Sequence, residues 1–200
     1  MVKLRKNMTV EQFENGYFYA SELRDFAKRL GIKAGSLRKN ELEEHIKAFL
    51  SGSRVAADLP KIVPNRKNSG MRDRLDAEEY IVNYVSDKKT KEFLLKEIAK
   101  IDNKLINKSG QWYWLNDWRK DQIARNRKIR YKDLIKRLYQ LMTTPGRLPR
   151  IPSTRFNNFI TDFLEDPANK GKTRKQAMDA WEKLKLMRVP KTYQAYKDNI

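Results

Sequence analysis

Apolar residues recur at helical spacing in two short runs near the start of the chain, Leu23 to Leu30 and Leu42 to Leu50. Gly31 is suited to end the first helix, and Ser36 can cap the second. Helices this short bury their apolar faces only against each other, with help from nearby aromatic residues. The pattern therefore predicts a small helix-loop-helix module over residues 10–52.

A longer helical region is predicted after a basic linker. Residues 53–74 mix prolines and glycine with lysines and arginines and show no apolar period, which is typical of a linker. Asp76 can cap a helix, and Thr173 with Gln176 has the pattern of a capping box. Apolar residues return at helical spacing in four runs, within residues 90–105, 131–142, 156–164 and 177–184. Residues 75–200 are therefore predicted to form one multi-helix domain.

The fold class follows from these periods. No segment shows the alternation of a strand, and no long internal repeat is present. The sequence predicts an all-α protein, in which a small N-terminal helix-loop-helix domain is joined by a basic linker to a C-terminal multi-helix domain.

The charge of the chain favours a polyanionic partner. Its 44 lysines and arginines outnumber 25 acidic residues, giving a formal net charge of +19. A field of that sign attracts DNA, RNA or an anionic membrane surface. The basic region lacks a matching continuous apolar face, which argues against the membrane surface.

Several classes of protein are excluded by what the sequence lacks. Without cysteine there is no disulfide scaffold, cysteine nucleophile or thiolate zinc site. Neither a signal-peptide pattern nor an apolar run of membrane-spanning length occurs, so we expect a cytoplasmic or nucleoid-associated protein. His45 is the only histidine, and no nucleophile elbow or phosphate-binding glycine loop is present. No catalytic residue, metal site or cofactor is predicted.

Short motifs in the N-terminal module carry a family resemblance. They are Glu22-Leu23, the turn Leu30-Gly31-Ile32, Gly35, Lys39, Glu41-Leu42 and the stretch from Ile46 to Leu50. With these residues, the segment 21–50 resembles the SAP domain, a helix-extended-loop-helix module of DNA-binding proteins. Between Gly35 and Leu42 the chain has about two more residues than the usual SAP spacing, which bears on the length of the loop contact more than on the fold.

Residues 75–187 are similar to a C-terminal domain that accompanies a SAP module in some bacterial proteins of unknown function. The similarity rests on Asn83-Tyr84, Lys91 to Leu94, the apolar run Phe156 to Leu164, and Gly171-Lys172-Thr173 followed by Ala177, Ala180 and Trp181. It implies an architecture and no activity.

In the SAP-like segment, the candidate DNA-binding residues surround the loop between the two helices. Lysines and arginines would contact phosphates, glycine allows close approach, and serine and asparagine add neutral hydrogen bonds. The residues are Lys28, Arg29, Lys33, Gly35, Ser36, Arg38, Lys39 and Asn40. Solvated surface charge is the alternative interpretation of each, and Glu41, Glu43 and Glu44 partly offset the cluster.

The densest positive charge lies in the basic segment, which we define as residues 118–150, where eleven lysines and arginines outnumber two aspartates. On a continuous helix, residues 120, 127, 128 and 131–132 would lie on one side, forming a stripe along a nucleic acid. The candidate contacts are Arg119, Lys120, Arg125, Arg127, Lys128, Arg130 and Lys132. The neighbouring aromatics, residues 112–114, are interpreted as core, with stacking on bases as the alternative.

These observations predict a protein that binds DNA without catalysing a reaction. Contacts to phosphates make the binding largely tolerant of sequence, with duplex DNA favoured and RNA as an alternative polyanion. One competing hypothesis is a DNA-tethered adaptor whose C-terminal domain binds another protein. Another is a metal-dependent nuclease, for which Asp87-Lys88-Lys89 and Asp102-Asn103-Lys104 supply an acid and lysines without a recognisable second acid.

Overall fold

The computed structural model describes residues 3–35, 37–52 and 71–200. Within those ranges the regular structure is helical throughout, and pairing of β type is limited to an isolated bridge between Tyr80 and Arg130. The predicted all-α fold class is confirmed over these residues. Ser36, together with residues 53–70 of the predicted linker, lies outside the described residues.

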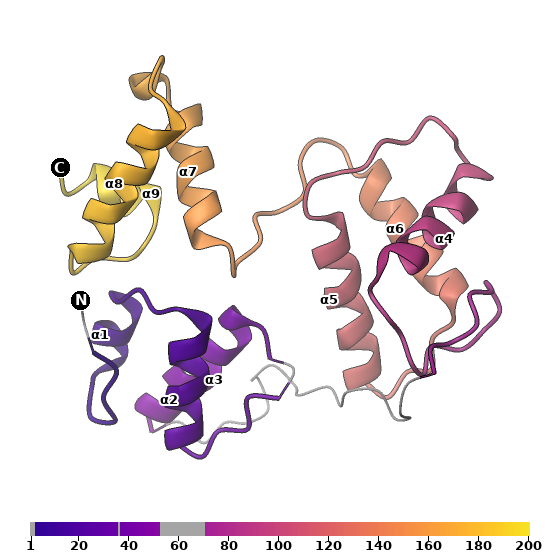
Figure 1. Ribbon diagram of the computed structural model, residues 1–200, viewed down its shortest axis with the longest axis horizontal. Coiled ribbons are helices and arrows are strands. Elements are labelled where there is room, and N and C mark those ends of the chain that lie inside the picture. Colours follow the sequence, from indigo (N-terminus) through magenta and orange to yellow (C-terminus); the bar gives the residue numbers. More distant parts are fainter. Residues whose placement is uncertain (1–2, 36, 53–70) are drawn as a thin grey trace. The chain divides into compact units, whose positions relative to one another are not determined.

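The chain divides into two compact units (Figure 1). Unit 1 combines Met1–Pro60 with Arg150–Ile200, and unit 2 consists of Lys61–Pro149. This division differs from the one that we predicted, because residues 150–200 group with the N-terminal module and not with residues 75–149. Unit 2 is thus an insertion between the two parts of unit 1.

The first part of unit 1 is a three-helix module with its own apolar core. Its helices are α1 (Val10–Glu14), α2 (Ala20–Arg29) and α3 (Lys39–Leu50). Buried side chains from all three helices meet in this core, among them Phe13, Phe26, Leu42 and Ile46. Removal of these apolar groups from water stabilises the module. The two predicted helices are present as α2 and α3, and α1 precedes them.

The sequence predicted the end of α2 more closely than the start of α3. Gly31 ends α2 with a φ of +76°, a left-handed conformation that favours glycine. The next helix begins at Lys39, later than a cap at Ser36 would give. Its first turn is closed by Glu41, whose carboxylate accepts the backbone N–H of Arg38 at 2.6 Å.

The second part of unit 1 is a helical hairpin with a short third helix. Its elements are α7 (Arg155–Glu165), the 3-10 turn η1 (Pro167–Asn169), α8 (Arg174–Leu186) and α9 (Tyr193–Lys197). Phe159 of α7 and Trp181 of α8 pack with their ring centroids 5.3 Å apart. The capping box predicted at Thr173 is present, because the backbone N–H of Thr173 donates to Gln176 Oε1 at 2.8 Å.

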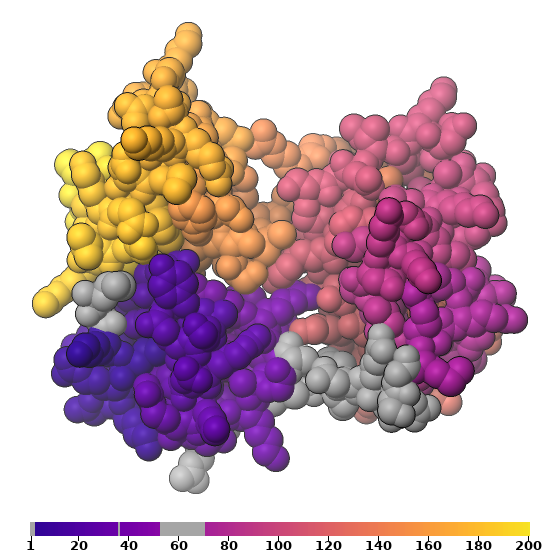
Figure 2. Space-filling view, viewed as in Figure 1, coloured from indigo at the N-terminus to yellow at the C-terminus, as the bar shows by residue number. Residues whose placement is uncertain are grey.

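Aromatic side chains join the two parts of unit 1. The ring of Tyr17, from the loop before α2, meets the indole of Trp181 edge to face, with centroids 5.1 Å apart. Phe156 packs against the same indole at 5.6 Å, and Trp181 is only 2% exposed. In Figure 2 the indigo N-terminal residues lie directly against the yellow and orange C-terminal helices. The N-terminal module is therefore packed onto α7 and α8.

Buried charges add to this packing. Glu43 of α3 is 4% exposed and accepts a 2.7 Å hydrogen bond from the guanidinium of Arg155 on α7. Burial raises the pKa of Glu43, and the charge of Arg155 opposes that shift. Lys191, 3% exposed, donates to the carbonyl of Asn15 at 2.7 Å and to two carbonyls of the α8–α9 loop. Burial lowers the pKa of Lys191 to about 8.

Unit 2 is built on three helices around a separate core. They are α4 (Lys88–Ala99), α5 (Gln111–Ala124) and α6 (Tyr131–Thr143). Leu94, Leu115, Leu134 and Leu138 are buried together between them. The apolar runs that predicted α4 and α6 thus supply most of this core.

The helix predicted to begin at Asp76 is absent from the described residues, and this prediction is wrong. The backbone here turns and runs beside the start of α6, where the N–H of Ile81 donates to the carbonyl of Ile129 at 2.9 Å. The carboxylate of Asp73 accepts the N–H of Asn83 at 2.7 Å. These partners replace the i to i−4 bonds of a helix, and Asp87 caps the next helix, α4.

Candidate nucleic-acid interface

The loop between α2 and α3 presents three candidate cations to solvent. Lys28 and Arg29 lie in the last turn of α2, and Lys33 follows in the loop; all three are exposed. Among the described residues, no carboxylate lies within ion-pair distance of them. Gly35, with φ of +43°, is exposed in the same loop, whereas Ser36 lies outside the described residues. This group has the exposure that phosphate contact requires.

The candidates at the start of α3 are turned toward the protein. The side chain of Arg38 is 15% exposed and lies 3.9 Å from the carboxylate of Glu41. The ammonium of Lys39 lies 4.2 Å from the centroid of the Tyr17 ring, in cation–π geometry. Burial lowers the pKa of Lys39, and neighbouring Glu43 opposes that shift. Asn40 is half-buried, so these three residues are partly engaged within the fold.

The continuous helical stripe predicted for the basic segment is wrong, because α5 ends at Ala124. Asn126 takes a left-handed conformation with φ of +56°. Its N–H donates to the carbonyl of Ile123 at 2.9 Å, and the N–H of Arg127 donates to that of Gln122 at 3.0 Å. This pair of bonds defines a Schellman motif, which closes the helix. The candidate cations are consequently split between α5, the α5–α6 loop and α6.

On α5, the candidate cations contact their own unit. Arg119 donates to Asn116 Oδ1 at 2.8 Å and lies over the ring of Tyr84 at 4.6 Å from its centroid. Arg125, which follows the last turn, pairs with Asp121 at 2.8 Å. Lys120 is half-buried and also has an interaction partner. These cations are therefore engaged with side chains of their own unit.

Glu78 neutralises the two candidates at the start of α6. Arg130 donates to the Glu78 carboxylate at 3.1 Å, and Lys132 donates to it at 2.7 Å. The hydrogen bond from Lys132 is the main reason that the pKa of Glu78 lies below its ordinary value. Arg130 also donates to the hydroxyl of Tyr80 at 2.9 Å and covers that ring at 4.2 Å. The two cations hold the segment before α4 against α6.

Arg127 and Lys128 are the candidates that unit 2 presents most openly. Both are exposed in the α5–α6 loop, where Arg127 completes the Schellman motif and Lys128 follows it. Arg127 donates to Gln122 Oε1 at 3.1 Å, and among the described residues neither side chain pairs with a carboxylate. This loop is a second, smaller group of available cations.

Two of the aromatic residues beside the basic segment are half-buried against the core of unit 2. Trp112 and Trp114 pack against the buried cluster, and the indole N–H of Trp114 donates to the carbonyl of Pro149 at 3.0 Å. The ammonium of Lys91 lies 5.5 Å from the Trp112 ring centroid. These contacts favour the interpretation as core over stacking on bases.

In the described part of the chain, no group of three or more histidine or acidic side chains is placed to hold a metal ion. Within the same residues, no helix combines the length and apolar character needed to cross a membrane. Comparisons with protein-family models, with curated proteins and with solved structures found no match.

Proposed function

We propose that this protein binds duplex DNA through phosphate contacts, largely without regard to sequence and without catalysing a reaction. The observation that carries the proposal is the group formed by Lys28, Arg29 and Lys33. The three side chains are exposed, close in sequence around one helix end and loop, and free of carboxylate partners among the described residues. Uncompensated like charges repel one another, and a polyanion relieves that repulsion.

The resemblance to the SAP domain supports the same residues. That family implies DNA contact around the loop between two helices, and the exposed cations lie at the end of α2 and in the loop that follows it. Arg38 and Lys39 contribute less directly in this proposal, because their side chains contact Glu41 and Tyr17. We assign them to holding the start of α3 in place.

A second contact is assigned to Arg127 and Lys128. Because these residues lie in unit 2, they are joined to the module by the chain itself, and linkage raises the affinity of two weak contacts through effective concentration. Arg119, Arg130 and Lys132 have protein partners and are assigned structural roles in the proposal.

The test measures DNA binding by fluorescence anisotropy over a salt series. The full chain is compared with the triple variant Lys28→Gln, Arg29→Gln, Lys33→Gln. Loss of three phosphate contacts should reduce the slope of log K against log salt by about 3 and raise Kd roughly 100-fold at 0.15 M salt. The matched control replaces Lys89, Lys96 and Lys104, which are exposed on unit 2, with glutamine. It removes the same charge and should change Kd only a few-fold.

The outcomes separate the competing hypotheses. Equal affinities for the two triple variants, with folding intact by circular dichroism, would show that general charge and not this group holds DNA. Tighter binding to RNA than to duplex DNA would replace the proposed ligand. Cleavage of the probe in Mg²⁺ would favour a nuclease, and no binding to any nucleic acid would favour the protein adaptor.

A further inference from the structure

The turn between α7 and α8 carries a basic cluster that was not among the predicted contacts. Lys170, Lys172, Arg174 and Lys175 lie within six residues of one another, and every residue from 170 to 176 is exposed. The sequence signal is the absence of any acidic residue between Asp166 and Asp179. We refer to these four residues as the tip cluster.

The tip cluster lacks the compensation that other basic residues of the protein have. Among the described residues, no carboxylate lies within ion-pair distance of the four side chains. Lys172 makes a single aromatic contact, 5.5 Å from the ring centroid of Phe163. By contrast, Arg130 and Lys132 share Glu78, and Arg125 pairs with Asp121. Four adjacent unpaired cations repel each other, which disfavours the cluster unless an anion binds there.

Buried and bridged side chains hold the base of this turn in place. The side-chain amide of Asn169, 8% exposed, donates to the carbonyl of Phe163 at 2.9 Å and to the hydroxyl of Tyr193 at 2.8 Å. The carboxylate of Asp166 accepts hydrogen bonds from Tyr193 at 2.7 Å and from Lys197 at 2.8 Å. A turn anchored in this way presents its cations with little loss of backbone entropy on binding.

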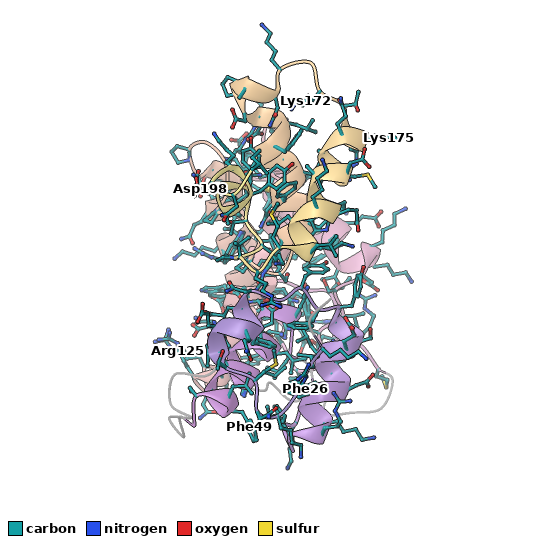
Figure 3. All side chains as sticks on the ribbon, turned by 90° about the vertical axis from the view of Figure 1, so that its left-hand side faces the viewer. Phe26, Phe49, Arg125, Lys172, Lys175 and Asp198 are labelled. Carbon is teal, nitrogen blue, oxygen red and sulfur yellow. The ribbon has the colours of Figure 1, made fainter. Side chains whose placement is uncertain are left out.

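The tip cluster is separate from the cations of the N-terminal module, although both belong to unit 1. In Figure 3, Lys172 and Lys175 lie at one end of the unit, and Phe26, on the helix that carries Lys28 and Arg29, lies at the other. Figure 1 places the α7–α8 turn and α2 in the same way. The two groups therefore reach different parts of a bound ligand.

We propose that the tip cluster is a further phosphate-binding surface for duplex DNA. Unit 1 would then contact DNA at two separate places. This inference rests on the proposed function and assigns it a site that neither the SAP-like segment nor the basic segment contains. Lysine and arginine side chains on an exposed turn contact the phosphate backbone without reading bases.

The experiment compares the full chain with the variant Lys170→Gln, Lys172→Gln, Arg174→Gln, Lys175→Gln. Two or more lost phosphate contacts should raise Kd for duplex DNA at least about 30-fold at 0.15 M salt and reduce the salt slope by about 2 or more. The control replaces Lys88, Lys89, Lys96 and Lys104 with glutamine and should have a much smaller effect. Because the tip cluster and the cations of the N-terminal module are remote from each other, the fold-changes in Kd of the two variants should multiply when the variants are combined.

Acetylation footprinting supplies an independent readout. Bound duplex should protect Lys170, Lys172 and Lys175 from acetylation, while Lys89 and Lys96 stay reactive. Suppose that the wild-type chain binds duplex DNA, that the tip variant has the same Kd as its control, and that the tip lysines are not protected. This inference would then be overturned, while the proposed function would stand. If the wild-type chain binds no duplex DNA, the proposed function fails and this inference fails with it.

Discussion

Arg155→Ala should destabilise unit 1 by leaving the carboxylate of Glu43 buried without its main partner. The side chain of Glu43 is 6% exposed, and that of Arg155 is 33% exposed. Loss of one partner from a fully buried pair costs about 3–5 kcal/mol, and water reaching the Arg155 side should reduce this to about 2–3 kcal/mol. Lys39, which also lowers the pKa of Glu43, remains nearby. Urea unfolding followed by circular dichroism measures the change.

The loss should depend on pH in a defined direction. Burial already raises the pKa of Glu43 in the folded protein, and removal of Arg155 raises it further. As pH falls from 8 to 5, the folded variant therefore takes up a proton at Glu43 before the unfolded chain does. Uptake of a proton by the folded state stabilises it. The difference between wild type and Arg155→Ala should consequently narrow toward pH 5.

Two controls make this prediction specific. Arg150→Ala removes a more exposed arginine that pairs with Asp162 at 2.7 Å, and it should cost under about 0.5 kcal/mol. Adding Glu43→Gln to Arg155→Ala removes the buried charge and should recover about half of the lost stability. Hydrogen exchange within α3 and α7 localises the effect to unit 1. The reasoning is refuted if Arg155→Ala resembles Arg150→Ala, or if its effect is the same at both pH values.

Two further variants test other parts of the structure. Asn126→Ala should lower the stability of unit 2 by about 1 kcal/mol, because alanine disfavours the left-handed φ of +56°. Asn126→Gly should leave the stability nearly unchanged, because glycine adopts this conformation readily. Thermal unfolding of both variants measures the two effects, and equal losses of stability would contradict the prediction. Hydrogen bonds from Lys197 and Tyr193 lower the pKa of Asp166 to about 2, so this group contributes stability above its ordinary pKa that is lost as pH falls toward 2. Acid titrations should then show Asp166→Asn losing less stability than wild type between about pH 4 and pH 2, and parallel curves would argue against the assignment.

Local apolar periods predicted α2, α3, α4, α6, α7 and α8, because those periods depend on neighbouring residues alone. They did not predict α1, α5 or α9, and α4 ends at Ala99, before the apolar run that was predicted to continue to Leu105. The runs that predicted α2, α6 and α8 supply buried residues in all three, and the capping box at Thr173 is present. The sequence signal failed at Asp76, where a capping pattern occurs without a helix. There the backbone forms hydrogen bonds with the residues just before α6, about 50 positions further along the chain. No local sequence pattern reveals a partner at that distance.

Long-range pairing also limited the prediction of the site. Glu43 was interpreted as a surface charge offsetting the module's cations, yet it is buried against Arg155, a residue 112 positions away. Similarly, the sequence predicts Arg130 and Lys132 as ligand contacts, and in the structure both pair with Glu78, more than 50 positions earlier in the chain. Composition located the positive charge, but only the three-dimensional arrangement showed which charges are already paired.

The insertion of unit 2 has a consequence for how the protein is made. Translation delivers the N-terminal module first, and about 90 residues of unit 2 follow before Arg155 is synthesised. About 135 residues separate the end of α3 from the end of α8. At roughly 5–20 residues per second, α8 is therefore complete roughly 7–27 s after the module. During that interval Tyr17 and Glu43 lack the partners that cover them in the finished fold. The nascent module therefore offers chaperones a surface that the mature protein conceals, whereas unit 2 is contiguous and can fold as soon as it emerges.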